Sequence, residues 1–217
     1  MNSAKVGVIL DFDDTIVALS TERWRRFKLL LADFGLDEDE LTSVDSRRGR
    51  SFRRLVGEKF RDDEFELFLS KYLSVLSQVQ PRATPGGKSA IQRLRGRGVV
   101  VVVVSSSHSR IVRQDLDLLG IEVDAVYGSD HTLAEKPDVG YLSSALGFLA
   151  AAAVDSSNVI SVGDSVTDYA MSRSICGFRG VLTGVSSRDD FVKAGLATRH
   201  IYPDLLAWVT EEDVGRV

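Results

Sequence analysis

Hydrophobic residues near the start of the chain form a short continuous run that ends abruptly in carboxylates. The run covers residues 6–10, is rich in β-branched side chains, and is followed by Asp11, Asp13 and Asp14. Such a run is typical of a strand buried on both faces, as in a parallel sheet. Open α/β sheets carry their functional groups beyond the carboxyl ends of their strands, so these carboxylates are candidates for a site.

The hydrophobic pattern then changes and repeats every three or four residues up to a segment with two prolines and two glycines over 81–87. This spacing predicts helices over 21–34, 51–60 and 64–79, with a shorter helical start over 37–41. No segment between Thr15 and Pro81 alternates as a strand would. We therefore expect a helical module inserted directly after the first strand.

From Lys88 onward, segments with helical periodicity alternate with short apolar runs. The runs predict strands over 99–104, 124–127, 158–162, 180–182 and 200–202, and the first of these is six consecutive valines. The intervening segments predict helices over 88–97, 109–119, 140–153, 167–174, 188–195 and 205–210. This alternation predicts an α/β fold with a parallel sheet and right-handed crossovers.

Composition places the chain among ordinary globular proteins and excludes some functions. Hydrophobic residues make up 44% and charged residues 27% of 217 positions, which is enough to form a core. The net charge of -4 argues against a general nucleic-acid binder. No apolar run is long enough to cross a membrane, and the first strand begins too close to Met1 for a signal peptide. A cytoplasmic location is therefore expected.

Polar groups also follow two of the later predicted strands. The valine strand ends in Ser105 and Ser106, whose hydroxyl and N–H groups suit an anion at a helix N-terminus. Plain capping of the following helix would explain these serines equally well. Lys136 follows the next strand and could neutralise a phosphate, although a solvated loop lysine is the simpler alternative.

Two more carboxylates, Asp164 and Asp168, follow the strand over 158–162. Asp11 and Asp13 would repel each other if they point into one site, so their pairing is best explained by a cation. Asp164 would complete an oxygen-rich site for a hard cation, for which Mg²⁺ is best suited. A solvated acidic turn is the alternative for the first pair, and helix capping is the alternative for Asp168.

The polar residues that follow the four predicted strands ending at 10, 104, 127 and 162 resemble, in type and order, the motifs of the haloacid dehalogenase superfamily of phosphohydrolases. The resemblance covers nearly the whole chain, and the inserted helices resemble the mobile cap of its phosphoglycolate phosphatase and β-phosphoglucomutase branch. It implies a Rossmann-like core domain over 1–16 and 82–217 and a helical cap domain over 17–81. The matching motifs are Asp11-x-Asp13-x-Thr15, the strand ending in Ser105, Lys136-Pro137 and Gly163-Asp164-Ser165-x-x-Asp168.

The resemblance also implies a role for each residue. Asp11 would attack phosphorus and form an aspartyl-phosphate, while Asp13 would protonate the leaving alcohol and then activate water. Mg²⁺ would be held by Asp11, the backbone carbonyl of Asp13 and Asp164. The supporting groups would be Lys136, Ser105 and the N–H of Ser106 on the phosphoryl oxygens, Thr15 on the loop that aims Asp13, and Asp168 on Lys136 or metal-bound water.

The resemblance leaves neighbouring activities open. A phosphomutase of the β-phosphoglucomutase type uses the same residues, and hydrolysis of inorganic pyrophosphate is a further alternative. A phospho-accepting receiver domain also uses acidic residues and a lysine. It is disfavoured because its phosphorylated aspartate normally follows a later strand and because it has no inserted cap.

The expected partner is a small phosphorylated metabolite, and the cap offers one hint about its chemistry. Arg47, Arg48 and Arg50 surround a glycine in a polar loop between two predicted cap helices. Arg48 and Arg50 would suit a second anionic group on the substrate, such as the carboxylate of phosphoglycolate. A solvated face of the cap explains these arginines equally well.

Overall fold

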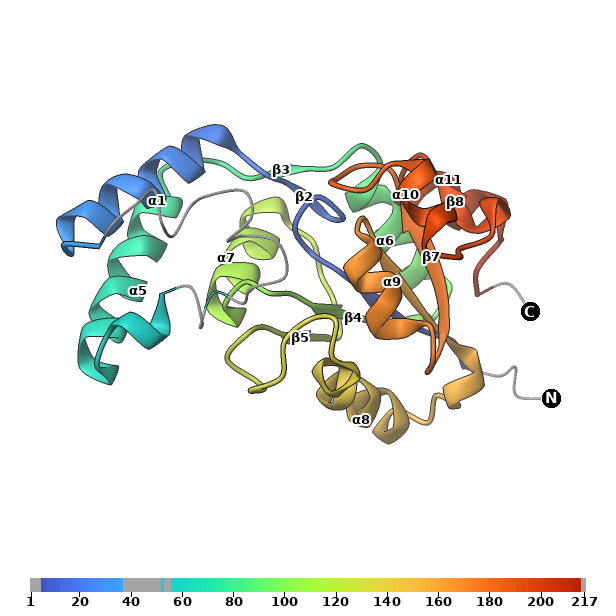
Figure 1. Cartoon of the computed structure of the whole chain (residues 1–217). Helices are drawn as coiled ribbons and strands as arrows, with labels where there is room; N and C mark the ends of the chain where they lie inside the picture. The colour runs from blue at the N-terminus through green and yellow to red at the C-terminus, as the bar shows by residue number, and fades with distance from the viewer. Residues whose placement is uncertain (1–4, 37–51, 53–55, 216–217) are drawn as a thin grey trace.

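A six-stranded parallel sheet forms the centre of the molecule in the computed structural model, which describes residues 5–36, 52 and 56–215 (Figure 1). The strand order is β5-β4-β1-β6-β7-β8, and every neighbouring pair is parallel. The predicted α/β class is therefore confirmed. The strands are β1 (Gly7–Leu10), β4 (Val100–Val104), β5 (Ala125–Tyr127), β6 (Val159–Gly163), β7 (Gly177–Val181) and β8 (Ile201–Tyr202).

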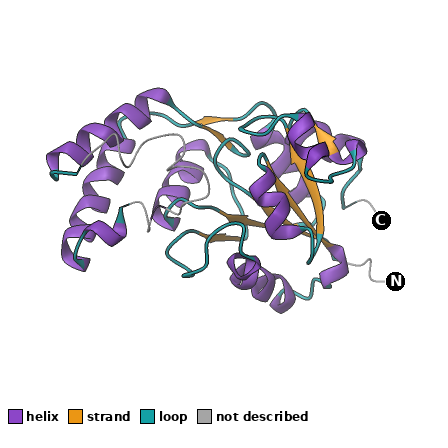
Figure 2. Cartoon of the chain, viewed as in Figure 1, coloured by secondary structure: helices purple, strands orange, loops and turns teal. Residues whose placement is uncertain are grey.

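Helices cover both faces of this sheet (Figure 2). Valines of β4 alternate between two core clusters, because successive side chains of a strand point to opposite faces. One cluster packs the sheet against α6 (Gly87–Gly96), α7 (Ser109–Leu119) and α11 (Leu205–Glu211). The other packs it against α8 (Ser143–Ala151) and α9 (Val166–Ser172), and α10 (Arg188–Lys193) covers the end near β7.

The helical insertion after β1 has a core of its own. It contains α1 (Thr21–Asp33), a 3₁₀ turn (Gly57–Lys59) and α5 (Asp62–Leu76), and α1 and α5 lie away from the strands in Figure 1. Phe27 of α1 and Phe68 of α5 are fully buried in an aromatic cluster, which Ile111 of α7 joins. The insertion therefore packs on the sheet domain through α7, an arrangement consistent with a cap.

A short strand, β2 (Val17–Ala18), corrects the prediction that no strand lies between Thr15 and Pro81. It pairs antiparallel with β3 (Arg82–Ala83), where the chain enters and leaves the insertion. Strands of two residues have no alternation that a sequence pattern can reveal. They join the two connections between the sheet and the helical insertion.

The other predicted elements differ from the structure mainly at their ends. The helix predicted from 140 begins as a 3₁₀ turn (Val139–Leu142) and continues as α8, while α5 ends before 79 and β7 begins before 180. The predicted helical start over 37–41 lies outside the described residues, as do residues 51 and 53–55 of the helix predicted over 51–60. The described end of that predicted helix forms the 3₁₀ turn Gly57–Lys59. None of the helices in the described part of the chain has the length and apolar character needed to cross a membrane.

Candidate active site

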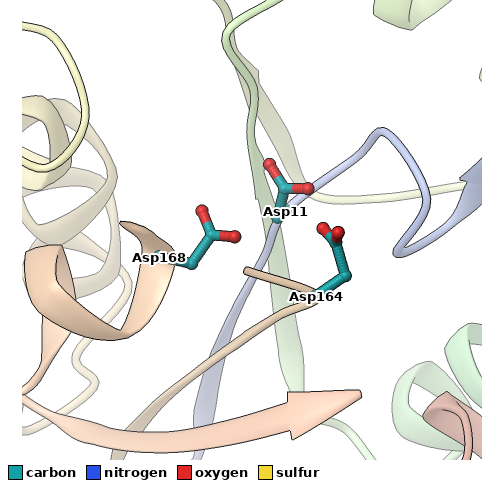
Figure 3. Close-up of side chains that lie close together, drawn as sticks. All are labelled: Asp11, Asp164 and Asp168. Carbon is teal, nitrogen blue, oxygen red and sulfur yellow. The ribbon is translucent and has the colours of Figure 1, made fainter. Parts of the chain in front are cut away.

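Three carboxylates meet at the carboxyl ends of two neighbouring strands. Asp11 follows β1 and Asp164 follows β6, and these strands end together because they pair in parallel register. The N–H of Asp11 donates to the carbonyl of Val162 at 2.9 Å, which extends this pairing by one residue. Asp168 joins them from α9, and one carboxylate oxygen of each residue lies within 4.8 Å of the others. Figure 3 shows the three side chains facing a common space.

Lys136 enters this cluster from the loop after β5. Its Nζ donates to Asp11 Oδ1 at 2.5 Å and to Asp168 Oδ1 at 2.7 Å, and its side chain is only 6% exposed. Burial by itself would lower the pKa of Lys136, but the charges of Asp11 and Asp168 outweigh it and raise this pKa above its usual value. Lys136 is therefore held in its charged form. Asp168 Oδ2 accepts from the Ser165 hydroxyl, so both oxygens of Asp168 are engaged.

Asp164 is held through both of its carboxylate oxygens. Thr15 Oγ1 donates to Asp164 Oδ1 at 3.2 Å, and the N–H of Val185 donates to Oδ2 at 2.9 Å. Burial, followed by the charge of Asp168, raises the pKa of Asp164 to about 6. Thr15 was expected to support the loop that aims Asp13, whereas its hydroxyl contacts Asp164.

Asp13 lies beside the cluster, with its carboxylate turned to a different partner. Ser107 Oγ donates to Asp13 Oδ2 at 2.8 Å. Burial and then the charge of Asp11 raise the pKa of Asp13 to about 7, although the bond from Ser107 opposes this rise. Sequence reasoning missed Ser107, because the run Ser105-Ser106-Ser107 does not show which hydroxyl reaches back to the first strand.

Ser105 and Ser106 occupy the turn between β4 and α7. Ser105 is fully buried, and its Oγ accepts from the N–H of Ser107 at 3.0 Å. The Tyr141 hydroxyl donates to the Ser105 carbonyl at 2.7 Å, while the Ser106 carbonyl accepts from the N–H of Phe52 in the helical insertion at 2.7 Å. The turn is thereby fixed from both sides. Arg48 and Arg50 lie outside the described residues.

The charge balance at the strand ends suits a divalent cation. Burial raises the pKa of Asp11 to about 8, a shift that Lys136 opposes and the charges of Asp168 and Asp164 increase. One lysine therefore does not offset the negative charge that three buried carboxylates would carry together. The available donors are oxygen atoms, which hard divalent ions prefer. Asp11, Asp164 and Asp168 each offer one carboxylate oxygen to such an ion.

The fold and the site define a hydrolase of a known family. A model of the haloacid dehalogenase-like hydrolases matches residues 8–176, and the chain belongs to this family. The match spans β1, the helical insertion and all four motifs that carry the site. This membership confirms the resemblance drawn from the motifs and decides against a receiver domain. A family enzyme with this site acts on a small phosphorylated substrate.

Solved structures of the same architecture come from several bacteria. A hydrolase from Pseudomonas syringae is 17% identical with a TM-score of 0.71, and the match covers 96% of this chain and 98% of that one. A predicted phosphoglycolate phosphatase from Haemophilus somnus is 18% identical with a TM-score of 0.71, covering 97% and 98%. A protein from Thermotoga maritima provisionally assigned as a β-phosphoglucomutase is 17% identical with a TM-score of 0.66, covering 95% and 99%. No curated protein matches the chain.

Proposed function

We propose that this protein is a Mg²⁺-dependent phosphatase that hydrolyses a small phosphomonoester through an aspartyl-phosphate on Asp11. One observation carries the proposal: the Asp11 carboxylate bonds to the ammonium of Lys136 and has an oxygen within 4.8 Å of carboxylate oxygens of Asp164 and Asp168. A nucleophilic carboxylate can attack an anionic phosphate only where positive charge offsets their repulsion. Lys136 supplies part of that charge, and a bound divalent ion would supply the rest.

In the first step, an Asp11 oxygen forms a bond to phosphorus while the bond from phosphorus to the leaving oxygen breaks. Asp13 gives its proton to that oxygen, and its raised pKa of about 7 allows it to hold a proton near neutral pH. Lys136 and the hydroxyl of Ser105 hold the phosphoryl oxygens, with the N–H of Ser106 beside them. Charge spreads over these oxygens in the transition state, so fixed donors accelerate the transfer.

In the second step, Asp13 accepts a proton from water, whose oxygen attacks phosphorus and breaks the bond to Asp11. Inorganic phosphate leaves, and Asp11 is restored as a carboxylate. Asp11, the Asp13 carbonyl and Asp164 would hold Mg²⁺, which would supply positive charge to offset that of the transferring group. Asp168 keeps Lys136 in place, because it binds the same ammonium as Asp11 does.

The cap proposed over residues 17–81 would enclose the leaving group during these steps. Arg48 and Arg50 of this cap would bind a second anionic group on the substrate, so the enzyme would prefer phosphomonoesters such as phosphoglycolate. That preference rests on the sequence of the cap alone. It is tested by comparing kcat/KM for phosphoglycolate with kcat/KM for a neutral aryl phosphate in the parent protein and in Arg48→Ala and Arg50→Ala.

The proposed mechanism predicts that Asp11→Asn abolishes turnover without loss of fold. An amide is close in shape to a carboxylate but is a poor nucleophile, so phosphate release from an aryl phosphate should fall by about 10³-fold or more. The thermal unfolding midpoint should stay near that of the parent protein. The exposed α7 residue Asp117 offers a matched control, since Asp117→Asn should leave turnover unchanged.

Two outcomes would change this assignment. Parent-like turnover in Asp11→Asn would remove Asp11 as the nucleophile. If the parent protein moved phosphate to a second hydroxyl of the substrate and released none to water, the enzyme would be a phosphomutase instead.

A further inference from the structure

The loop after β7 packs directly on the segment that carries Asp164. The N–H of Val185 donates to Asp164 Oδ2 at 2.9 Å, and the N–H of Ser186 donates to the Asp164 carbonyl at 3.1 Å. Ser186 Oγ in turn accepts from the N–H of Val166 at 3.0 Å, at the start of α9. Three hydrogen bonds therefore hold this loop against the segment that carries Asp164, and one of them is made to the carboxylate itself.

Gly184 stands in this loop and leaves the space that the Asp164 carboxylate occupies. A Cβ on Gly184 would lie 2.0 Å from Asp164 Oδ2, 2.5 Å from Asp164 Cγ and 2.7 Å from Asp14 Cβ. All three distances are well below the 3.4–4 Å of ordinary contact. The carboxylate cannot swing away freely, because Thr15 Oγ1 and Val185 N bind its two oxygens. A side chain at 184 must displace either Asp164 or the loop.

The position of Gly184 means that an alanine there should act on the Asp164 carboxylate without disturbing the fold. Gly184 is exposed, so a methyl group there does not enter a hydrophobic core. Its backbone φ also lies outside the left-handed region, since glycines in that region are Gly35, Gly86, Gly98, Gly120, Gly195 and Gly215 among the described residues. An alanine at 184 therefore meets a local overlap with the carboxylate rather than backbone strain.

We propose that Gly184 is a positioning residue for the cation site, because the absence of a side chain at 184 sets the direction in which Asp164 presents its oxygens. The inference rests on the part of the proposed function that assigns Asp164 to a divalent ion. Residues that orient metal ligands typically change metal affinity by 10–100-fold when they are altered. Gly184→Ala should therefore weaken divalent-ion binding by about tenfold or more.

The test measures Mn²⁺ binding, because Mn²⁺ prefers the same oxygen ligands as Mg²⁺ and its free form can be counted by electron paramagnetic resonance. Gly184→Ala is compared with the parent protein and with Gly147→Ala. Gly147 lies in α8 and a Cβ there meets nothing within 4 Å, so this control should bind Mn²⁺ as the parent does. Unfolding of each variant in chelator reports the fold independently of metal.

Weaker Mn²⁺ binding by Gly184→Ala, with an unchanged unfolding midpoint in chelator, supports the inference. Parent-like Mn²⁺ binding by Gly184→Ala overturns the inference. Weaker binding together with a lower unfolding midpoint in chelator also overturns it, because the loss would then come from a damaged fold. A double variant, Gly184→Ala with Asp14→Gly, identifies the group that is displaced. If this variant recovers parent affinity, the overlap acts through Asp14 and the inference about Asp164 is wrong. If the parent protein itself fails to bind Mn²⁺, the proposed metal site fails first.

Discussion

At the residue scale, the two aspartates of the first motif differ because of what surrounds them. Asp11 bonds to the ammonium of Lys136, whereas Asp13 accepts a hydrogen bond from the Ser107 hydroxyl. The two residues are only two positions apart in the chain, but their partners come from different segments. Lys136 lies in the loop after β5, and Ser107 lies in the turn after β4. The carboxylate that we propose as the nucleophile therefore lies beside a cation, and the carboxylate that we propose as the acid lies beside a neutral donor, where burial favours its protonated form.

Ser107→Ala should impair the proton transfer assigned to Asp13. A hydrogen bond to a charged group contributes roughly 1.5–3 kcal/mol, so its loss should lower kcat/KM for an alkyl phosphate by about 10–100-fold. An aryl phosphate with a good leaving group needs little protonation, so its kcat/KM should change much less. Steady-state kinetics on the two substrates measure this difference.

Two comparisons accompany the Ser107 prediction. Ser107→Thr keeps the hydroxyl and should recover most of the activity on the alkyl phosphate, whereas Ser157→Ala on the protein surface should match the parent. An equal loss on both substrates in Ser107→Ala would show that Ser107 supports the phosphate site or the fold instead of Asp13.

The candidate site could be predicted from the sequence as far as its residues come directly after strands. Asp11 and Asp164 come directly after strands, and the carboxyl ends of parallel strands share one edge of the sheet, so the pattern predicts that they meet. Lys136 lies farther along the loop after β5, and the resemblance of Lys136-Pro137 to a family motif predicts its place. Ser107 and Val185 were missed because their contacts depend on side-chain direction and on the path of a loop. Neither position has a residue type that marks it, since serine and a backbone N–H are found in most turns.

At the scale of elements, α7 is the helix that joins the helical insertion to the sheet. Its Ile111 enters the aromatic cluster of α1 and α5, and Gln114 donates to the Leu73 carbonyl at 2.9 Å. Asp115 of α7 forms a bidentate ion pair with Arg23 of α1, and the two side chains are 2% and 11% exposed. Burial raises the pKa of Asp115 even though Arg23 opposes this, so the pair carries a real cost of desolvation.

Breaking the Arg23–Asp115 pair should destabilise the protein more than breaking an exposed pair between the same regions. Asp115→Asn leaves the Arg23 charge buried and should lower the free energy of unfolding by about 3–5 kcal/mol. Arg110 of α7 and Glu66 of α5 also form an ion pair at 2.8 Å, but their side chains are 47% and 64% exposed. Glu66→Gln should therefore lower the free energy of unfolding by less than about 1 kcal/mol. Urea unfolding of both variants measures the difference.

A double replacement tests the origin of this loss. Arg23→Met with Asp115→Leu removes both charges and should recover much of the stability, because no buried charge is left unpaired. Equal effects of Asp115→Asn and Glu66→Gln would contradict the idea that burial sets the strength of the contact between α1 and α7.

The sequence predicted the elements of the sheet better than their contacts with the insertion. The continuous valine run over 99–104 and the helical periodicity over 109–119 are strong signals, and the structure has β4 and α7 at these positions. The strands β2 and β3 escaped prediction because two residues are too few to show a period. The ion pair of Arg23 and Asp115 joins positions 92 residues apart, which a local pattern cannot reveal.

At the scale of the whole molecule, the crowded charges of the site lower the stability of the fold. Three carboxylates and one lysine converge at the strand ends, and burial raises the pKa of Asp11 and Asp164 because their charged forms are disfavoured there. Such crowding is tolerated at functional sites, where a ligand can offset it. A cation that binds the folded chain should therefore stabilise the whole protein.

Mg²⁺ should raise the thermal unfolding midpoint of the parent protein, and Asp164→Asn should abolish most of this rise. A ligand at about 100 times its Kd stabilises the folded state by roughly 2.7 kcal/mol, which for a domain of this size corresponds to a rise of about 5–11 °C. Calorimetry in Mg²⁺ and in chelator, at matched ionic strength, measures the rise. In chelator Asp164→Asn should unfold close to the parent, because two effects oppose each other. Loss of a repulsive charge stabilises the fold, and loss of a hydrogen-bond acceptor destabilises it. The exposed Asp117→Asn variant should keep the full response, and an equal Mg²⁺ response in Asp164→Asn would place the ion elsewhere on the protein.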